Sequence, residues 1–252
     1  MREAKLRTTW TDPEPEFEAA LQADIAALLD PVRSPRFLDD LERFVRRIAR
    51  PGLWNALSRT VIHLASPGVP DLYQGDELWN FALVDPDNRR PVDYERRRRL
   101  LEEVERGDAS EAGVREAFLR ELVASPEDGR LKLHVVRAAL AARRSRPGPF
   151  RSRDYRPLEA DGRAAGRIVA FGRGEGKERM IAIVPRWLGR LDGAPTDSRH
   201  WSGTVLRLPQ GWPGRWRCAL SGRALGVGEQ GLAMAEVFGI LPVALLLAEP
   251  DA

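Results

Sequence analysis

Carboxylate, guanidinium and aromatic side chains are concentrated between residues 67 and 93, where the sequence reads PGVPDLYQGDELWNFALVDPDNRRPVD. Aromatic rings stack on the faces of sugar rings, and carboxylates and guanidiniums fix sugar hydroxyls by bidentate hydrogen bonds. The segment therefore fits a carbohydrate site. It fits equally well a surface loop in which Asp and Asn form turns and Arg pairs with nearby acids.

Within this segment Glu77 is either a hydroxyl ligand or the partner of an Arg that holds the loop. Trp79 is either a stacking platform or a core residue. The neighbouring Arg89 and Arg90 would point apart, so that at most one of them reaches a substrate. The acidic and amide side chains either bind hydroxyls or form turns beside the prolines. The full set of candidate substrate-binding residues is Tyr73, Gln74, Glu77, Trp79, Asp85, Asp87, Asn88, Arg89 and Arg90.

The elements around this loop follow from apolar periodicity. A short strand from Val69 to Tyr73 is predicted to enter the loop through a turn at Gly75. A charged helical region over 94–125 is predicted to follow, with a break at Gly107-Asp108. In its densest basic run, Arg98 with Glu102 and Arg99 with Glu103 would form i,i+4 pairs on a solvated face. The other helices are predicted over 14–30, 36–49, 52–65 and 130–144.

After residue 148 the pattern changes to short β-branched and apolar runs separated by Gly, Asp and Pro. Residues 167–173 and 180–187 are predicted to form a hairpin. An antiparallel sheet domain, a β-sandwich, is therefore expected over residues 149–252, after a mainly helical region over residues 1–148. The further strands of this domain are expected over 204–208, 216–220, 233–238 and 243–248.

One pattern in this chain resembles the eighth barrel strand and following loop of α-amylase-type enzymes; it consists of Gly68, Pro70, Tyr73, Gly75 and Glu77. The continuation LVDPDNRRPVDY is narrower and resembles the maltooligosyltrehalose synthases, a branch of that family. Those enzymes convert the reducing-end α-1,4 bond of a maltooligosaccharide into an α,α-1,1 bond. The resemblance covers nearly the whole chain, because residues 2–10, 154–171 and 241–246 also agree.

The resemblance implies an α+β multidomain chain. Residues 1–148 would supply the C-terminal part of a (β/α)8 barrel, namely its last helices and its eighth strand, and residues 149–252 the all-β sandwich. A complete barrel takes about 250 residues. The nucleophile Asp, the general-acid Glu and the third catalytic Asp of the family lie on earlier strands, and no motif of this chain matches them. The chain is therefore expected to be a C-terminal portion, truncated or from a split reading frame, without catalytic residues and inactive alone.

The activity implied by the resemblance is that of an isomerase, an intramolecular transglucosidase with a retaining mechanism. Its partners would be a maltooligosaccharide substrate and, for a split or truncated protein, the remainder of the barrel. Two alternatives stay open. The chain could belong to another α-amylase-type hydrolase or transglucosidase, or it could be a non-catalytic carbohydrate-binding or interaction module.

Composition excludes several classes of protein. Hydrophobic residues make up 43% and charged residues 31% of the chain, as in a globular protein. No run approaches the ~20 apolar residues of a membrane helix, and the N-terminus lacks the apolar core of a signal peptide. The net charge of only +3 argues against nucleic acid as a partner. The single cysteine, Cys218, excludes an internal disulfide and favours a reducing, cytoplasmic location.

No cofactor and no metal are expected, because no phosphate-binding glycine loop and no histidine with a carboxylate or cysteine at ligand spacing is present. His63 is expected to be structural, and His134 and His200 are not expected to bind metal. Lys5 and Trp10 are candidates only through the resemblance. Four tryptophans of the β region form either a starch-binding platform or core and edge packing; they are Trp187, Trp201, Trp212 and Trp216.

Overall fold

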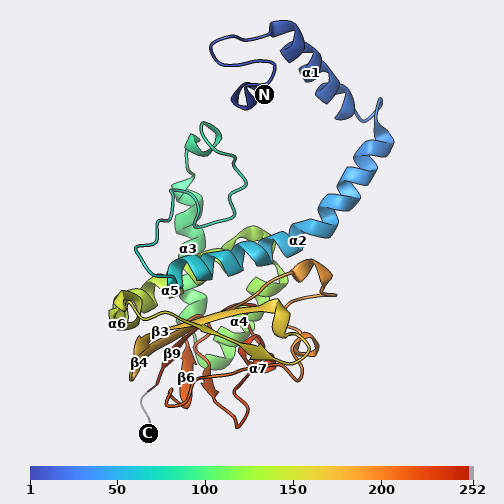
Figure 1. Cartoon of the computed structure of the whole chain (residues 1–252). Coiled ribbons are helices and arrows are strands. Elements are labelled where there is room, and N and C mark those ends of the chain that lie inside the picture. The colour runs from blue at the N-terminus through green and yellow to red at the C-terminus, as the bar shows by residue number, and fades with distance from the viewer. Residues whose placement is uncertain (250–252) are drawn as a thin grey trace. The chain divides into compact units, whose positions relative to one another are not determined.

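The computed structural model describes residues 1–249 and divides into two compact units, Met1–Arg50 and Pro51–Ala252 (Figure 1). The helix α2 (Pro35–Ala65) contains the division, at its internal proline Pro51. No helix among the described residues is long and apolar enough to cross a membrane.

The first unit contains a short 3-10 turn, η1 (Arg2–Ala4), the helix α1 (Pro15–Leu28) and the first part of α2. Arg2 donates to Glu18 at 2.7 Å, and the hydroxyl of Thr8 donates to the same carboxylate at 2.5 Å. These two donors lower the pKa of Glu18 to about 2. The helix predicted over residues 14–30 is thereby confirmed, and it is tied to the N-terminal turn.

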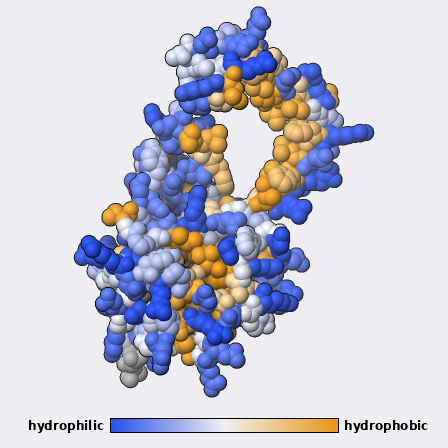
Figure 2. All heavy atoms as spheres, viewed as in Figure 1, coloured by the Kyte–Doolittle hydropathy of each residue, from blue (hydrophilic) through white to orange (hydrophobic). Residues whose placement is uncertain are grey.

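The first part of α2 carries an exposed row of large apolar side chains, visible along one side of the helix in Figure 2. These side chains recur at helical spacing, so they share one face. We call this row the apolar stripe; it consists of Phe37, Leu41, Phe44, Val45 and Ile48.

Helix α2 runs without interruption through Pro51 and Gly52, so the two separate helices expected over 36–49 and 52–65 are wrong in this respect. Proline removes one helical hydrogen bond, which disfavours a continuous helix at this position. After Pro51 the helix buries Trp54, Leu57 and Leu64. This packing outweighs the local preference for a break.

The second unit contains the remaining helices. The Asp93 side chain accepts from the backbone N–H of Arg96 at 2.8 Å, and this N-cap begins α3. The predicted break at Gly107-Asp108 and the helix predicted over 130–144 are confirmed. The helices after α2 are α3 (Tyr94–Asp108), α4 (Ala112–Ala124), α5 (Arg130–Ser145), α6 (Pro147–Arg151) and α7 (Met234–Val237).

The described strands form a six-stranded sheet in the order β1-β3-β4-β9-β6-β7 and a three-stranded sheet in the order β2-β5-β8, with antiparallel pairing. The predicted hairpin over 167–187 is confirmed as β3 and β4. The strand bounds are β1 (Arg156–Leu158), β2 (Ala160–Asp161), β3 (Ile168–Glu175), β4 (Glu178–Pro185), β5 (Val205–Leu206), β6 (Arg215–Cys218), β7 (Ala224–Gly226), β8 (Leu232–Ala233) and β9 (Ala244–Ala248).

The strand expected over residues 233–238 is wrong for most of its length. Only β8 is extended, and the chain then turns into α7. Met234, Val237 and Phe238 are buried at the i, i+3 and i+4 spacing of a helix, and Phe238 donates its N–H to the carbonyl of Met234 at 3.0 Å. The short apolar run was compatible with either structure.

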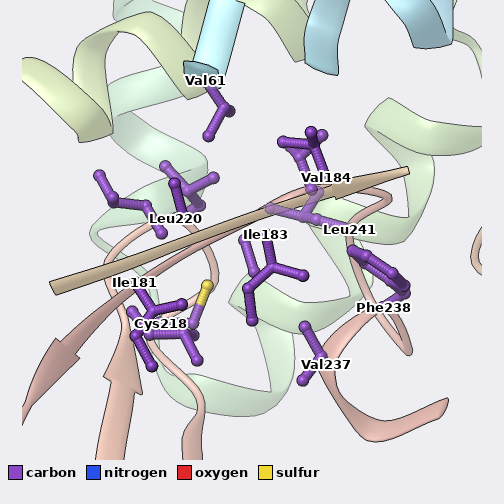
Figure 3. Packing of buried hydrophobic residues seen from close by; sticks show 14 of the residues in the cluster. Val61, Ile181, Ile183, Val184, Cys218, Leu220, Val237, Phe238 and Leu241 are labelled. Carbon is purple, nitrogen blue, oxygen red and sulfur yellow. The ribbon is translucent and has the colours of Figure 1, made fainter. Parts of the chain in front are cut away.

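One core connects the helices of the second unit with the six-stranded sheet. In Figure 3 Val184 of β4 lies on the side of Val61 from α2, whereas Ile181 and Ile183 lie on the other side of the strand. Both faces of β4 are therefore covered. Helices mostly precede residue 148 and strands follow it, as expected, but the core crosses that position. A folding boundary near residue 148 remains a prediction.

The strand predicted over residues 69–73 is absent. Among residues 1–249 no strand pairs with this segment, and its side chains Val69 and Tyr73 are exposed. A single extended segment is not stable as a strand without a neighbour that satisfies its backbone groups.

Candidate functional site

A cavity of about 450 Å³ lies within the loop that follows residues 69–73 and the start of α3. This volume is in the range of small-molecule sites, about 300–1,000 Å³. Five of the predicted site residues line the cavity, whereas Tyr73, Glu77, Asp85 and Arg89 do not. The lining consists of Gln74, Gly75, Trp79, Asn80, Phe81, Ala82, Asp87, Asn88, Arg90, Pro91, Val92, Asp93 and Arg97.

The charged residues of the loop pair with one another around the 3-10 turn η2 (Asp87–Arg89). Arg89 pairs with Asp85, and Arg90 pairs with Asp87, so the neighbouring guanidiniums have different partners. Arg89 first and the Asn88 side chain second hold the pKa of Asp85 below its ordinary value. Asp87 also accepts the N–H of Leu83 at 2.8 Å, which closes a local turn.

Three side chains in the cavity wall carry groups that no hydrogen bond of the protein satisfies. The Oδ1 atom of Asn88 is buried and has no hydrogen-bond partner among the described residues. No hydrogen bond of the Gln74 side chain is present in residues 1–249, and the ring of Phe81 is 81% exposed. A buried acceptor without a donor costs free energy, about 1–3 kcal/mol. An amide acceptor, an amide side chain and an aromatic face suit a sugar.

Glu77 and Trp79 are held by the protein. Arg97 donates to the Glu77 carboxylate at 3.1 Å, which is the structural alternative predicted for this glutamate. The indole N–H of Trp79 donates to the carbonyl of Pro126 at 2.6 Å, and the Lys132 ammonium lies 5.7 Å from its ring centroid. The Trp79 ring forms part of the cavity wall while its polar atom is satisfied elsewhere.

The irregular segment before and within the loop is held by basic side chains that donate to its main-chain carbonyls. His63 contacts the carbonyl of Asp71 at 2.8 Å, and Arg97 donates to that of Gly75 at 2.7 Å. Lys132, which is buried, donates to the carbonyl of Leu78 at 2.9 Å. These contacts satisfy main-chain carbonyls of a segment that has no ladder hydrogen bonds.

Sequence reasoning missed the role of Arg97, because the basic run at the start of α3 was interpreted as a solvated face. Arg97 turns back toward the loop. The expected helical pairs are also replaced, since Arg98 donates to Glu95 at 2.7 Å and Glu103 pairs with Arg130 at 3.6 Å. The only sequence signal for Arg97 was its place three residues into a capped helix beside the loop.

Burial lowers the pKa of Lys132, and Asp76 opposes this effect, whereas Arg59 adds to it. These three residues share a second cavity, of about 370 Å³, on the side of α2. It lies against the segment over 71–76, and its lining contains no Phe, Tyr or Trp. A third cavity, of about 630 Å³, lies in the β region among glycines, Asp161 and Arg207, also without Phe, Tyr or Trp.

The remaining candidates have structural roles or stand apart from the loop. His134 is buried and contacts the carbonyl of Leu220 at 2.7 Å, and Cys218 is a buried free thiol. No group of three or more metal-ligating side chains occurs in the described part of the chain. Trp10 donates to Glu3 at 2.8 Å within the first unit, as part of the N-terminal turn that includes Lys5.

The tryptophans of the β region form no common platform. Trp201 and Trp216 are fully buried and donate to the carbonyls of Pro195 and Pro213, and Trp212 packs 6.2 Å from Trp216. Only Trp187 is largely exposed. The packing alternative therefore holds for three of the four.

The chain is similar to maltooligosyltrehalose synthases. It is 34% identical over 249 residues to a "putative maltooligosyl trehalose synthase" of Mycobacterium tuberculosis strain H37Rv, which covers 99% of this chain and 27% of the relative. The solved maltooligosyltrehalose synthase of Arthrobacter ramosus superposes with a TM-score of 0.74 at 32% identity, over 98% of this chain and 29% of the other. No protein-family model matches the chain.

A second solved structure, a hypothetical maltooligosyl trehalose synthase of Sulfolobus tokodaii, superposes with a TM-score of 0.59 at 23% identity and supports the fold. It covers 97% of this chain. The resemblance found in the sequence is thus confirmed. The chain spans only 27 to 29% of the length of these relatives.

Proposed function

We propose that this chain is the C-terminal part of a maltooligosyltrehalose synthase and that the loop over residues 74–90 forms part of its sugar site. The observation that supports this proposal most directly is the similarity over 99% of the chain to relatives with that name. The cavity in the loop adds a site of suitable size, with an unpaired amide acceptor at Asn88 and an exposed ring at Phe81.

In the proposed reaction a carboxylate displaces the reducing-end glucose, and a covalent glycosyl-enzyme forms. The freed glucose turns, and its anomeric hydroxyl then displaces the carboxylate. The attacking carboxylate and the general acid would come from residues outside this chain. Reattack outcompetes hydrolysis only if the freed glucose stays oriented and water is excluded. We assign this holding task to the loop, because its free groups can hydrogen-bond hydroxyls while its ion pairs keep it in shape.

The proposed partner is the remainder of a barrel, either on the same polypeptide or on a second one. The apolar stripe supports this proposal, since contiguous exposed apolar surface marks interaction sites. The segment over residues 69–73 supports it as well, because its backbone lacks a neighbouring strand. We further propose a cytoplasmic location, with which the buried free thiol of Cys218 agrees.

A hybrid enzyme tests the proposal. It consists of the Arthrobacter ramosus synthase in which the matched region is replaced by this chain, and it is incubated with maltopentaose. We expect a trehalose-terminated product from the hybrid and none from this chain alone or from the truncated synthase alone. A folded hybrid that releases only glucose and shorter maltooligosaccharides would support the hydrolase alternative. Turnover by the isolated chain would contradict the assignment of the catalytic carboxylates to another part of the enzyme.

A further inference from the structure

The last turn of α2 ends at a point where no regular structure follows, so its carbonyl groups need partners from elsewhere. Arg173, on β3, supplies them. Its Nη1 atom donates to the carbonyls of Ala65 at 3.0 Å and Ser66 at 3.1 Å. The helix end and the sheet are thereby joined by one side chain across more than a hundred residues of sequence.

The other arm of the same guanidinium reaches the segment that precedes the sheet. Nη2 of Arg173 donates to the carbonyl of Phe150 at 2.9 Å and to that of Ser152 at 2.6 Å. Arg173 is only 1% exposed, and no carboxylate in residues 1–249 pairs with it. Burying a charge without a counter-ion destabilises the folded state, because the charge loses its hydration. Hydrogen bonds to four carbonyl oxygens compensate part of this cost.

Arg143, on α5, completes the arrangement. It donates to the carbonyls of Leu64 at 2.6 Å and Gly68 at 3.3 Å, and its guanidinium lies 5.0 Å from the ring centroid of Phe150. Two cations thus lie at the C-terminal end of α2, where the helix dipole favours positive charge. Gly68 adopts a φ of 107°, a conformation that L side chains rarely adopt.

The direction in which the chain leaves α2 is therefore set by side chains from α5 and the sheet. From Gly68 the segment runs to the candidate loop without any ladder hydrogen bonds, and its next anchors are the carbonyls of Asp71, Gly75 and Leu78. A shift at the helix end would be transmitted to the loop, because no strand in the described residues holds the chain between them.

We propose that Arg173 is a positioning residue for the sugar site: it fixes the exit of α2 from within the sheet and so places the loop over residues 74–90. This inference rests on the proposed function of that loop. By this inference the six-stranded sheet takes part in the reaction because it supports the loop. It does not need to bind carbohydrate by itself.

Hydrogen exchange of the whole chain tests the positioning directly, with Arg173→Ala as the variant. We expect the amides of Ser66 and Asp76, which donate to the carbonyls of Ile62 and Tyr73, to exchange faster by about tenfold or more, because the helix end loses its charged hydrogen bonds. Amides of β4 should change much less. Millimolar guanidinium chloride should restore protection by filling the vacated space, whereas sodium chloride at equal ionic strength should not.

Arg179→Ala is the matched control, because Arg179 lies on the neighbouring strand β4, is also largely buried, and packs 4.5 Å from the ring centroid of Trp212. It makes no contact with the end of α2 in the described residues. Its loss should leave exchange of the Ser66 and Asp76 amides at the parent rate relative to β4. The proposal would be overturned if the Arg173→Ala chain exchanges at the parent rate. It would also be overturned if exchange rises equally throughout the chain and guanidinium does not reverse the rise.

If Arg173→Ala does not fold, Arg173→Lys is used in its place, because an ammonium has only three donors for the four carbonyls and lacks the planar fork of a guanidinium. The same local loss of protection is expected. In the hybrid enzyme, Arg173→Lys should raise the ratio of free glucose to trehalose-terminated product. An unchanged ratio would overturn the positioning role, yet it would leave the proposed function standing, because that depends on trehalose formation by the unmutated hybrid.

Discussion

Arg97 donates its Nη2–H to the main-chain carbonyl of Gly75 at 2.7 Å, although the two residues are 22 positions apart. Gly75 has a φ of 94°, and a Cβ at this position would lie 3.3 Å from Arg97 Nη2 and 3.3 Å from Val92. The turn therefore needs a glycine for its conformation and for the close approach of the guanidinium. The same guanidinium also holds Glu77.

Replacing Arg97 by Ala should loosen this turn. The variant loses hydrogen bonds to Gly75 and Glu77, and we expect the free energy of unfolding to fall by about 1–2 kcal/mol, because Arg97 is mostly but not fully shielded from water. Urea unfolding followed by circular dichroism measures the change. Arg98→Ala, which removes only an exposed pair with Glu95, should change stability by less than about 0.5 kcal/mol. Equal effects of the two variants would contradict the structural role of Arg97.

Stability should fall in mild acid because of His134. Burial lowers the pKa of this imidazole below its ordinary 6.5 in the folded chain. Below pH 6.5 the unfolded chain therefore binds a proton that the folded chain does not, and stability decreases as pH falls, by up to about 1.4 kcal/mol per pH unit.

His134→Gln can keep a donor for the Leu220 carbonyl but has no titrating group. The free energy of unfolding of both proteins is measured between pH 7 and 5, in ~0.5-unit steps. As pH falls, the free energy of unfolding of the parent should decrease more than that of the variant. A difference that stays constant over this range would show that His134 is not buried in its neutral form.

The apolar stripe should be needed for association with the rest of the enzyme. Leu41 and Phe44 lie at its centre, and burying such side chains stabilises a complex by about 1.5–3 kcal/mol each. We expect the double substitution Leu41→Glu, Phe44→Glu to weaken binding of this chain to the truncated Arthrobacter synthase by more than about tenfold. Analytical ultracentrifugation of the mixture measures this.

Arg46→Ala serves as the control for the stripe, because Arg46 lies on the same helix and pairs with Glu42 in solvent. Its binding should match that of the parent chain. If the double variant binds as tightly as the parent, the stripe is not the contact surface. Self-association of the parent chain that the double variant abolishes would identify a second copy as the occupant.

Local sequence signals were sufficient for the elements that depend on their own residues. The helices α3 to α5 and the β3–β4 hairpin follow from apolar spacing, capping and turn residues. Local signals led to wrong predictions where packing against residues distant in sequence determines the structure. Two helices were predicted on either side of Pro51, yet α2 continues through it and buries Trp54 and Leu57. The segment over 69–73 has strand composition, yet no partner among the described residues completes a ladder.

Residue types made the loop a candidate site without deciding between a carbohydrate site and a surface loop. Five of the nine predicted side chains line a cavity there. Which acid pairs with which guanidinium depends on η2, and the sequence left these alternatives open. The supports Arg97, Lys132 and Arg173 could not be predicted, since each donates to carbonyls of residues remote in sequence.

The ratio of free glucose to trehalose-terminated product tests the central claim most directly, measured for the hybrid enzyme with Asn88→Ala. Loss of the buried Oδ1 acceptor should let water capture the intermediate more often and raise the ratio about two- to tenfold, as expected for one hydrogen bond of about 0.5–1.5 kcal/mol. Asn55→Ala, which removes an exposed amide from α2, should keep the parent ratio. A ratio equal to the parent's in the Asn88→Ala hybrid would contradict the claim that this loop holds the released glucose.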